Sequence, residues 1–253
     1  MKQEQLLRYS RHILLPKIDL VGQQKIMDSR ILVMGCGGLG CTVIPFLAAS
    51  GVGSLTIIDD DVVDMSNLQR QTHYTNENIG QLKAEAMADY IARQNSEISV
   101  MPISLRLDQK ALTTLCESHD VIVDCSDNFK TRHMVNKASV ATKVPMVFGS
   151  ALRFEGQLTV FDPRDSKSPC YACLFDQSEN EQDNCSFSGV FSPLVGIIGA
   201  RQAAEAIKLI VGIGESAVGT LFHYDVLSLK EYPLKVTPNP HCQICNARLK
   251  ENS

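Results

Sequence analysis

A glycine-rich turn directly after an apolar run constrains the fold of this chain more than any other feature. Residues 31–34, Ile-Leu-Val-Met, lead into Gly35-Cys36-Gly37-Gly38-Leu39-Gly40, a G-x-G-x-x-G pattern. Glycines here allow positive φ and let backbone N–H groups approach a phosphate at the start of the next helix. Asp59 follows Gly38 by 21 residues and ends the next apolar run. In nucleotide-binding folds of this kind, a carboxylate at about this spacing binds the ribose hydroxyls. The pattern predicts a nucleotide-binding strand–turn–helix unit, with a ligand-free tight turn as the alternative.

The composition favours one α/β domain in the cytoplasm. Of 253 residues, 44% are hydrophobic, which is enough for a full core. The formal net charge of −4 gives no field that favours nucleic acid or an anionic membrane. The sequence also shows no apolar signal-peptide core and no apolar run long enough to span a bilayer. The nine cysteines are many for a reducing compartment, so clustered ones are expected to be metal ligands or catalytic thiols.

Strand-like and helical segments alternate over the first 150 residues. This alternation predicts a Rossmann-like, mainly parallel sheet covered by helices on both faces. After Gly149, short strand-like segments separated by turns predict an antiparallel extension. Pro163–Gly189 is polar and is expected to be a mobile loop, and Ser192 is expected to cap the helix that follows it. We expect one domain with N-terminal helices (1–29), a nucleotide-binding half (30–150) and an extension (151–253). The expected helices are 3–15, 20–28, 38–51, 80–95, 128–142 and 192–211, and the expected strands after the first are 54–59, 98–103, 121–124, 145–148, 157–161, 220–224 and 231–236.

Two cations and an acid can meet at the carboxyl edge of that sheet, where open α/β sheets bind ligands. Arg70 lies in a run of hydrogen-bonding residues, Lys83 follows on a predicted helix, and Asp127 comes just after a buried strand. Cations neutralise charge on phosphate oxygens, and a carboxylate can hold Mg²⁺. This set suits phosphoryl or nucleotidyl transfer better than hydride transfer. The alternative is that Arg70 and Lys83 are solvated surface charges.

Five motifs together resemble the MoeB/ThiF/HesA family, bacterial relatives of the ubiquitin-activating enzymes. They are Arg8-Tyr9-Ser10-Arg11, Gly35–Gly40, Ser66–Gln71, Asp124–Asn128 and Glu155-Gly156-Gln157. The resemblance covers residues 5 to 246. It implies ATP-dependent adenylation of the C-terminal glycine of a small ubiquitin-like sulfur-carrier protein that ends in Gly-Gly, by a homodimer.

The resemblance also implies which residues act. Arg11 would reach into the partner subunit's site, and Asp127 would hold Mg²⁺. The carrier's carboxylate is already ionised near neutral pH, so attack on the α-phosphorus of ATP needs no general base. Alignment and charge stabilisation by Arg11, Arg70, Lys83 and Asp127 would then suffice. The implied ATP-site residues are Gly35, Gly37, Gly38, Gly40, Asp59, Ser66, Asn67, Leu68, Gln69, Arg70, Lys83, Asp127 and Asn128.

Two C-x-x-C pairs, Cys170/Cys173 and Cys242/Cys245, supply the four thiolates that structural Zn²⁺ prefers. The 68 residues between the pairs exclude a local zinc finger, so the metal would attach the C-terminal tail to a distant loop. A redox-active C-x-x-C is the alternative, although neither pair has the expected strand-to-helix setting.

Cys185 lies in the polar loop and could attack the acyl adenylate or accept sulfur. In the thiamine branch of the family the matching cysteine joins the carrier covalently. The alternative is an incidental loop cysteine. A sulfurtransferase is a further possible partner.

Three other interpretations of the function remain open. Arg153-Phe154-Glu155-Gly156-Gln157 resembles the molybdopterin-synthase branch more closely, and this branch is favoured. Two other motifs, Arg8-Tyr9-Ser10-Arg11 and Gly22-Gln23-Gln24-Lys25, look closer to the thiamine branch. A nicotinamide-dependent oxidoreductase would explain the glycines and Asp59 but not the cations or the four thiolates. A non-catalytic scaffold is disfavoured because the charged residues of the motifs are present.

Overall fold

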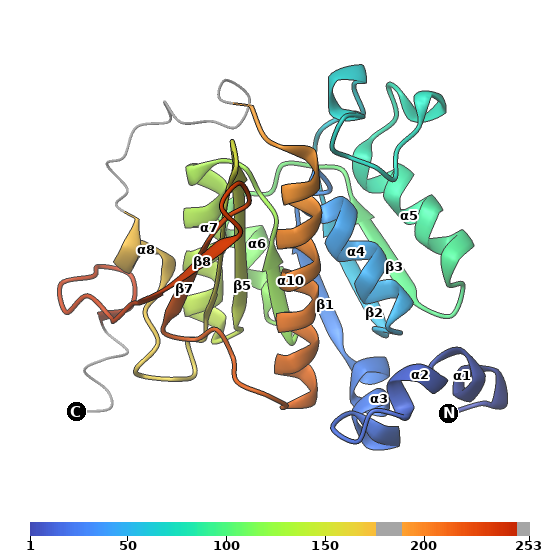
Figure 1. The fold of residues 1–253 in the computed structure, drawn as a ribbon, viewed down its shortest axis with the longest axis horizontal. Helices are drawn as coiled ribbons and strands as arrows, with labels where there is room; N and C mark the ends of the chain where they lie inside the picture. Colours follow the sequence, from blue (N-terminus) through green and yellow to red (C-terminus); the bar gives the residue numbers. More distant parts are fainter. Residues whose placement is uncertain (176–188, 247–253) are drawn as a thin grey trace.

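The apolar runs form one eight-stranded sheet in a computed structural model that describes residues 1–175 and 189–246 (Figure 1). The strand order is β3-β2-β1-β4-β5-β6-β7-β8. Strands β1 to β5 pair in parallel and β5 to β8 pair antiparallel. The mainly parallel Rossmann-like sheet with an antiparallel extension is therefore confirmed. The strands are β1 Arg30–Met34, β2 Ser54–Ile58, β3 Ser99–Ile103, β4 Val121–Asp124, β5 Met146–Leu152, β6 Glu155–Phe161, β7 Thr220–Asp225 and β8 Lys230–Lys235.

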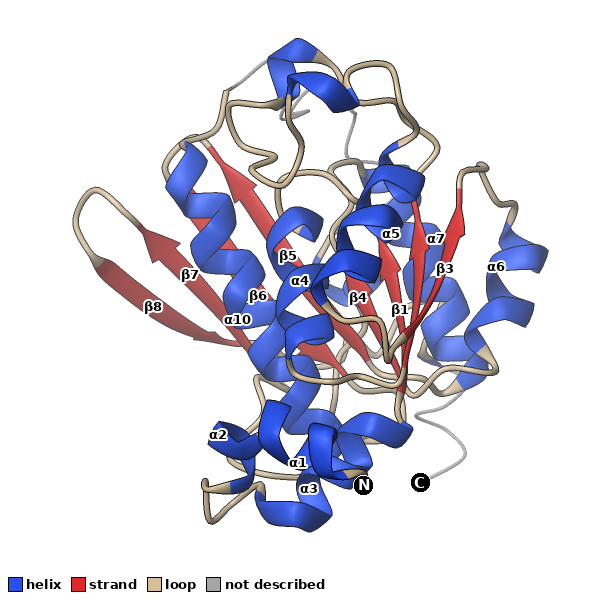
Figure 2. Cartoon of the chain, turned by 90° about the vertical axis from the view of Figure 1, so that its right-hand side faces the viewer, coloured by secondary structure: helices blue, strands red, loops and turns tan. Residues whose placement is uncertain are grey.

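Helices cover both faces of the sheet (Figure 2). Successive strand residues point to opposite faces, so Ile31 and Val33 of β1 join one buried cluster while Leu32 and Met34 join another. Helices α4, α5 and α10 pack on the first face, and α6, α7 and α8 pack on the second. The helices are α1 Gln3–Arg8, α2 Ser10–Ile13, α3 Asp19–Asp28, α4 Gly40–Ala49, α5 Lys83–Gln94, α6 Gln109–Cys116, α7 Phe129–Thr142, α8 Tyr171–Leu174 and α10 Ser192–Val211, with short 3₁₀ turns at Met65–Asn67 and Asn76–Asn78.

The strand order reverses between β1 and β4. The chain runs from β1 outward to β2 and β3, and then returns to add β4 and β5 on the other side of β1. Met34 pairs with Asp124, so both strands end at the same level. The glycine loop (Gly35–Gly40) and the 125–128 loop therefore lie side by side at the topological switch point, where open α/β sheets bind ligands.

The N-terminal helices α1 to α3 lie beyond the amino ends of the parallel strands (Figure 2). Tyr9 is buried and fixes them, because its hydroxyl accepts a hydrogen bond of 2.9 Å from Asn95 Nδ2. Gly51 has φ +86°, and a Cβ there would lie 2.5 Å from the Tyr9 ring. The expected single helix over 3–15 is interrupted at Tyr9, which separates α1 from α2.

Three further differences from the expected helices concern α8, α6 and α10. Helix α8 lies within the expected loop 163–189. The helix α6 was not expected, although Asp108 caps it by accepting from the Ala111 N–H at 2.8 Å. Ser192 is not a helix cap, because it is the first residue of α10 and its hydroxyl donates to Gln69 O at 2.6 Å. Gly212, with φ +80°, ends α10 directly after residue 211, where the expected helix ends. None of the helices in the described residues has the length and apolar character needed to cross a bilayer.

Close contact between α10 and the start of α4 ties the glycine loop to the sheet. A Cβ at Gly199 would lie 2.8 Å from Leu39 O and 2.8 Å from Thr42 Cβ. At Gly196, one helical turn earlier, the nearest atom outside the helix would be Thr42 Oγ1 at 3.9 Å. The two glycines share a helix but differ in the space around them.

We expect Gly199→Ala and Gly196→Ala to change stability in opposite directions. Both gain up to about 1 kcal/mol of helix propensity. In Gly199→Ala the clash with Leu39 and Thr42 outweighs this gain, for a net loss of about 1–3 kcal/mol. Denaturant unfolding of the two variants measures the difference, and equal stabilisation of both would contradict the packing described here.

Candidate nucleotide and metal sites

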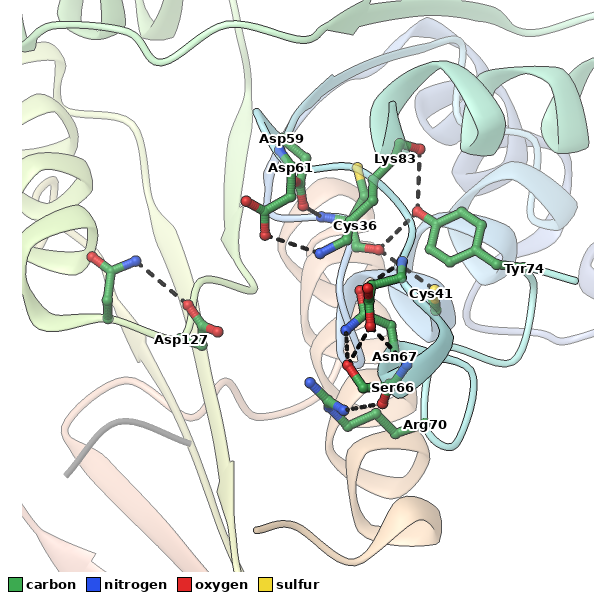
Figure 3. A network of polar contacts seen from close by, with 12 residues as sticks. Cys36, Cys41, Asp59, Asp61, Ser66, Asn67, Arg70, Tyr74, Lys83 and Asp127 are labelled. Atoms are coloured by element: carbon green, nitrogen blue, oxygen red, sulfur yellow. Dashed lines mark hydrogen bonds and ion pairs between the residues drawn. The ribbon is translucent and has the colours of Figure 1, made fainter. Parts of the chain in front are cut away.

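The glycine loop makes a tight turn between β1 and α4. Gly35 has φ +98°, and a Cβ there would lie 2.9 Å from the carbonyl oxygen of Cys125. A Cβ at Gly40 would lie 2.1 Å from Gly35 O, so only glycine allows the helix to start this close to the strand. Tyr74 holds the loop from behind, since its hydroxyl contacts Cys36 O at 2.9 Å and Lys83 O at 3.1 Å (Figure 3).

A cavity of about 840 Å³ opens between the glycine loop and the 125–128 loop. Most of the predicted nucleotide-site residues meet there, although they come from five separate segments of the chain. The predicted residues that line the cavity are Gly35, Gly37, Gly38, Asp59, Asn67, Arg70, Lys83, Asp127 and Asn128.

Asp59 lies at the end of β2 and faces the glycine loop. Its carboxylate accepts the Cys36 N–H at 2.7 Å and the Asp61 N–H at 2.9 Å. Burial raises the pKa of Asp59, and these two hydrogen bonds oppose that rise. Each carboxylate oxygen has a second lone pair, so the group can also accept hydroxyl donors from the cavity.

The two predicted cations approach the cavity from different elements (Figure 3). Lys83, the first residue of α5, is buried, and its Nζ lies 2.9 Å from Asp61 Oδ2, which is exposed. Arg70 is half-buried, and its Nη1 donates to Ser66 O at 3.2 Å. The Lys83 ammonium and the Arg70 guanidinium both line the cavity, where such cationic groups can stabilise the negative charge of phosphate oxygens.

Asp127 faces these cations from the other side of the cavity (Figure 3), and Asn128 also lines the cavity. Asp127 is exposed, and its Oδ1 accepts from Asn128 Nδ2 at 3.4 Å. Asn128 caps α7, because its Oδ1 accepts the Thr131 N–H at 2.9 Å. Capping fixes the backbone at this point, so the Asp127 carboxylate is held on a rigid helix start.

Some predicted site residues do not line the cavity. Ser66 donates its hydroxyl to Asp64 at 2.6 Å, and Gln69 Nε2 donates to Val190 O at 3.4 Å, so both support the segment that carries Arg70. Gly40 and Leu68 also lie outside the cavity lining, and the role of these four residues in the nucleotide site stays a prediction. Cys185 lies outside the described residues.

Sequence reasoning missed several polar residues of the cavity. Arg132 and Gln71 are buried and line it, and Arg106 and Lys130 add two exposed cations. Arg132 lies on α7, five residues after Asp127. Its closeness in sequence to a predicted site acid was the signal that could have indicated a place in the cavity. Gln71 ends the predicted Ser66–Gln71 motif.

The two C-x-x-C pairs meet as one four-cysteine cluster of Cys170, Cys173, Cys242 and Cys245, with all four sulfurs within 4.8 Å of one another. The Sγ–Sγ distances are 3.8 Å for Cys170–Cys173, 3.6 Å for Cys170–Cys242 and 3.4 Å for Cys173–Cys245. Zinc–sulfur bonds of about 2.3 Å in a tetrahedron give edges of about 3.8 Å. Hydrogen bonding from Cys170 lowers the pKa of the Cys173 thiol. The four residues fit a tetrahedral zinc site.

The other four described cysteines, Cys36, Cys41, Cys116 and Cys125, are all buried. Burial raises the pKa of Cys41 and Cys116 to about 12, and it raises the pKa of Cys36 and Cys125 as well. Thiols with raised pKa values are poor nucleophiles near neutral pH.

The fold and the switch-point cavity define a Rossmann-like α/β protein with a phosphate-type glycine loop. A model described as the ThiF family matches residues 9–246. The chain belongs to the ThiF family, which confirms the resemblance seen in the sequence.

Curated relatives match over nearly the whole chain. The molybdopterin-synthase adenylyltransferase of Salmonella typhimurium is 42% identical over 245 residues, covering 97% of this chain and 98% of that protein. The sulfur carrier protein ThiS adenylyltransferase of Escherichia coli is 40% identical over 245 residues, covering 97% of each. Among solved structures, E. coli MccB with ATP has a TM-score of 0.82 and 27% identity, covering 94% of this chain and 73% of that one.

We expect the purified protein to contain about one zinc ion per chain, because four thiolates supply a closed tetrahedral site. Metal analysis checks this, and less than about half an equivalent would contradict it. Cys242→Ser should lose the metal, whereas Cys116→Ala, a buried thiol on α6, should keep it.

Proposed function

We propose that the protein adenylates the C-terminal glycine of a small ubiquitin-like sulfur-carrier protein, using ATP and releasing pyrophosphate. The observation that carries this proposal is the single cavity that joins the glycine loop, Asp59, two cations and Asp127. Relatives named as adenylyltransferases, at 40–42% identity over nearly the full length, support it.

The residues of the cavity divide into three tasks. The glycine loop offers backbone N–H groups to phosphate oxygens, and Asp59 accepts the ribose hydroxyls. Arg70 and Lys83 neutralise charge that spreads over the α-phosphate oxygens as the carrier's carboxylate attacks. That carboxylate is ionised near neutral pH, so alignment takes the place of a general base.

Asp127 is the residue that would hold Mg²⁺. Its carboxylate is exposed at the cavity, and oxygen donors are the ligands this cation prefers. When bound, the ion supplies charge neutralisation at the phosphates. Asn128 keeps the Asp127 side chain in place through the 3.4 Å hydrogen bond to Oδ1.

The carrier we propose belongs to molybdenum cofactor biosynthesis. The Arg153–Gln157 pattern and the relative at 42% identity support this branch. The thiamine-pathway carrier is the second candidate, supported by the relative at 40% identity, with Cys185 as a covalent thiol in that case. A sulfurtransferase would then deliver sulfur to the activated carrier.

A nicotinamide-dependent oxidoreductase is the weaker candidate. Bound pyrophosphate needs only the backbone loop, whereas this cavity also presents Arg70, Lys83 and Asp127. NADH binding without any ATP binding would favour the oxidoreductase.

We further propose that the protein acts as a homodimer in the cytoplasm. Arg11 is exposed on α2, and α2 lies beyond the amino ends of the parallel strands (Figure 2). The cavity is lined by the loops that follow the carboxyl ends of these strands. Arg11 therefore serves the partner subunit's cavity rather than its own. Exposed Leu7 and Leu14 on either side of Arg11 supply apolar surface for such an interface.

We expect Asp127→Ala to abolish carrier-dependent ATP–pyrophosphate exchange, a loss of at least about 100-fold, because the charge that organises the phosphates is gone. Thermal unfolding should stay unchanged, since the side chain is exposed. Asp89→Ala, an exposed carboxylate on α5, is the matched control and should keep wild-type exchange. Wild-type exchange in Asp127→Ala would overturn the proposal.

The same assay, run with each candidate carrier in turn, distinguishes the two branches. Exchange stimulated by the molybdopterin-type carrier alone is the expected result. Stimulation only by the thiamine-type carrier would establish the second candidate.

Mixing two inactive variants tests the role of Arg11. Arg11→Ala and Asp127→Ala should each be inactive alone. After subunit exchange about a quarter of the sites should recover, since half of randomly mixed dimers carry both chains and have one intact site each. Exchange assays before and after mixing measure this. Failure of the mixture to recover activity, with both variants shown to be dimers by gel filtration, would contradict action in trans.

A further inference from the structure

Two buried polar residues on one face of α7 connect the four-cysteine cluster with the nucleotide cavity. Arg132 and Asn136 are four residues apart, so they lie one above the other on the helix. Their exposed fractions are 8% and 0%. Burying an arginine and an asparagine is costly unless each is hydrogen-bonded, so their contacts show what they hold in place.

Asn136 contacts the metal end of this face. Its Oδ1 accepts the Tyr171 N–H at 2.9 Å, and its Nδ2 donates to Cys170 Sγ at 3.7 Å. Tyr171 follows Cys170 directly and begins α8. One amide therefore contacts both a candidate zinc ligand and the backbone that carries it, which is how outer-shell groups orient metal ligands.

Arg132 contacts the nucleotide end. Its Nε and Nη2 donate to the Ser126 carbonyl at 3.3 and 3.1 Å, and Nη2 also donates to Ser150 Oγ at 3.3 Å. Ser126 immediately precedes Asp127. A charged two-nitrogen contact to this carbonyl fixes the peptide that presents the Asp127 carboxylate.

Packed aromatic rings join the two ends beside the helix. The Arg132 guanidinium lies 5.3 Å from the Phe148 ring centroid, and the Phe148 ring packs against Tyr171 at 5.3 Å between centroids. All three side chains are buried. The cluster and the 125–128 loop are thus attached to one packed unit, not to separate mobile loops.

We propose that Asn136 and Arg132 are positioning residues that couple zinc binding at the four-cysteine cluster to nucleotide binding in the cavity. Without the metal, the segment of Cys170 and Tyr171 loses its attachment to the C-terminal tail. The partner of Asn136 can then move, and with it α7 and the peptide before Asp127. This inference rests on the proposed function only in taking ATP as the nucleotide and zinc as the metal.

Thermodynamic linkage between zinc binding and ATP binding can be tested without measuring enzyme turnover. If zinc strengthens ATP binding by some factor, then ATP must strengthen zinc binding by the same factor. We expect Mg-ATP to raise the zinc affinity of the wild-type protein by roughly 5- to 150-fold, the usual range for coupled sites. Equilibrium competition with a chromophoric zinc chelator, with and without saturating Mg-ATP and with no carrier present, measures this.

The variants separate coupling from general stability. Asn136→Ala should bind zinc more weakly, and its zinc affinity should no longer increase when Mg-ATP is added. Ser139→Ala is the matched control, since it removes a buried 2.6 Å hydrogen bond to Val144 O at the far end of α7, and it should keep the full effect. Arg132→Lys keeps the positive charge but not the two-nitrogen contact to the Ser126 carbonyl. Mg-ATP should therefore increase the zinc affinity of this variant less than that of the wild type.

Zinc affinity that is the same with and without Mg-ATP in the wild type, while Mg-ATP itself binds, would overturn this inference alone. The inference would also be overturned if Mg-ATP increased zinc affinity by the same factor in the wild type, Asn136→Ala and Arg132→Lys. Wild-type protein that binds zinc but no ATP would overturn the proposed function, and this inference with it.

Discussion

The close approach of the ends of β1 and β4 is the constraint on which the rest of the structure depends. Gly35 turns with φ +98° directly against the carbonyl of Cys125, where any side chain would collide. Gln202 of α10 secures the same place from the face of the sheet, because its Nε2 donates to Asp124 O at 2.7 Å. With the two strand ends held together, the glycine loop and the 125–128 loop become the two walls of one cavity. The Asp59 carboxylate is attached to the first wall through the Cys36 N–H, and Arg132 is attached to the second through the Ser126 carbonyl.

Two charged groups of the cavity, Lys83 and Asp59, are held by contacts within the protein itself. Lys83 is buried beside the exposed Asp61, and the Asp59 carboxylate accepts two backbone N–H groups that oppose the effect of burial on its pKa. A site prepared in this way needs little rearrangement when a phosphate group enters, which is the physical basis of electrostatic preorganisation. The four-cysteine cluster and the proposed α7 link extend this rigidity to the side of the cavity that carries Asp127.

Local patterns predicted most of the elements and the centre of the site. Glycine spacing identified the loop, and acids just after apolar runs identified Asp59 and Asp127, because parallel strands end at one edge of a sheet. Helix α6 escaped prediction although Asp108 was a suitable cap, and Ser192 was assigned a capping role that the structure contradicts, since its hydroxyl bonds to Gln69 O instead. The capping role assigned to Ser192 is wrong because a hydroxyl binds whichever acceptor the tertiary structure brings near, and the sequence does not show that acceptor.

The sequence by itself determined the positions where backbone geometry or ligand chemistry admits few residue types: the glycines of the loop, the acids at strand ends and the paired cysteines. Only the tertiary structure decided which distant groups meet. The two cysteine pairs, 68 residues apart, close into one cluster, and Lys83 finds Asp61. Arg132 turns inward to hold the Ser126 carbonyl rather than outward to solvent. Such contacts depend on strand register and helix packing, which sum many weak interactions along the whole chain, so no short segment encodes them.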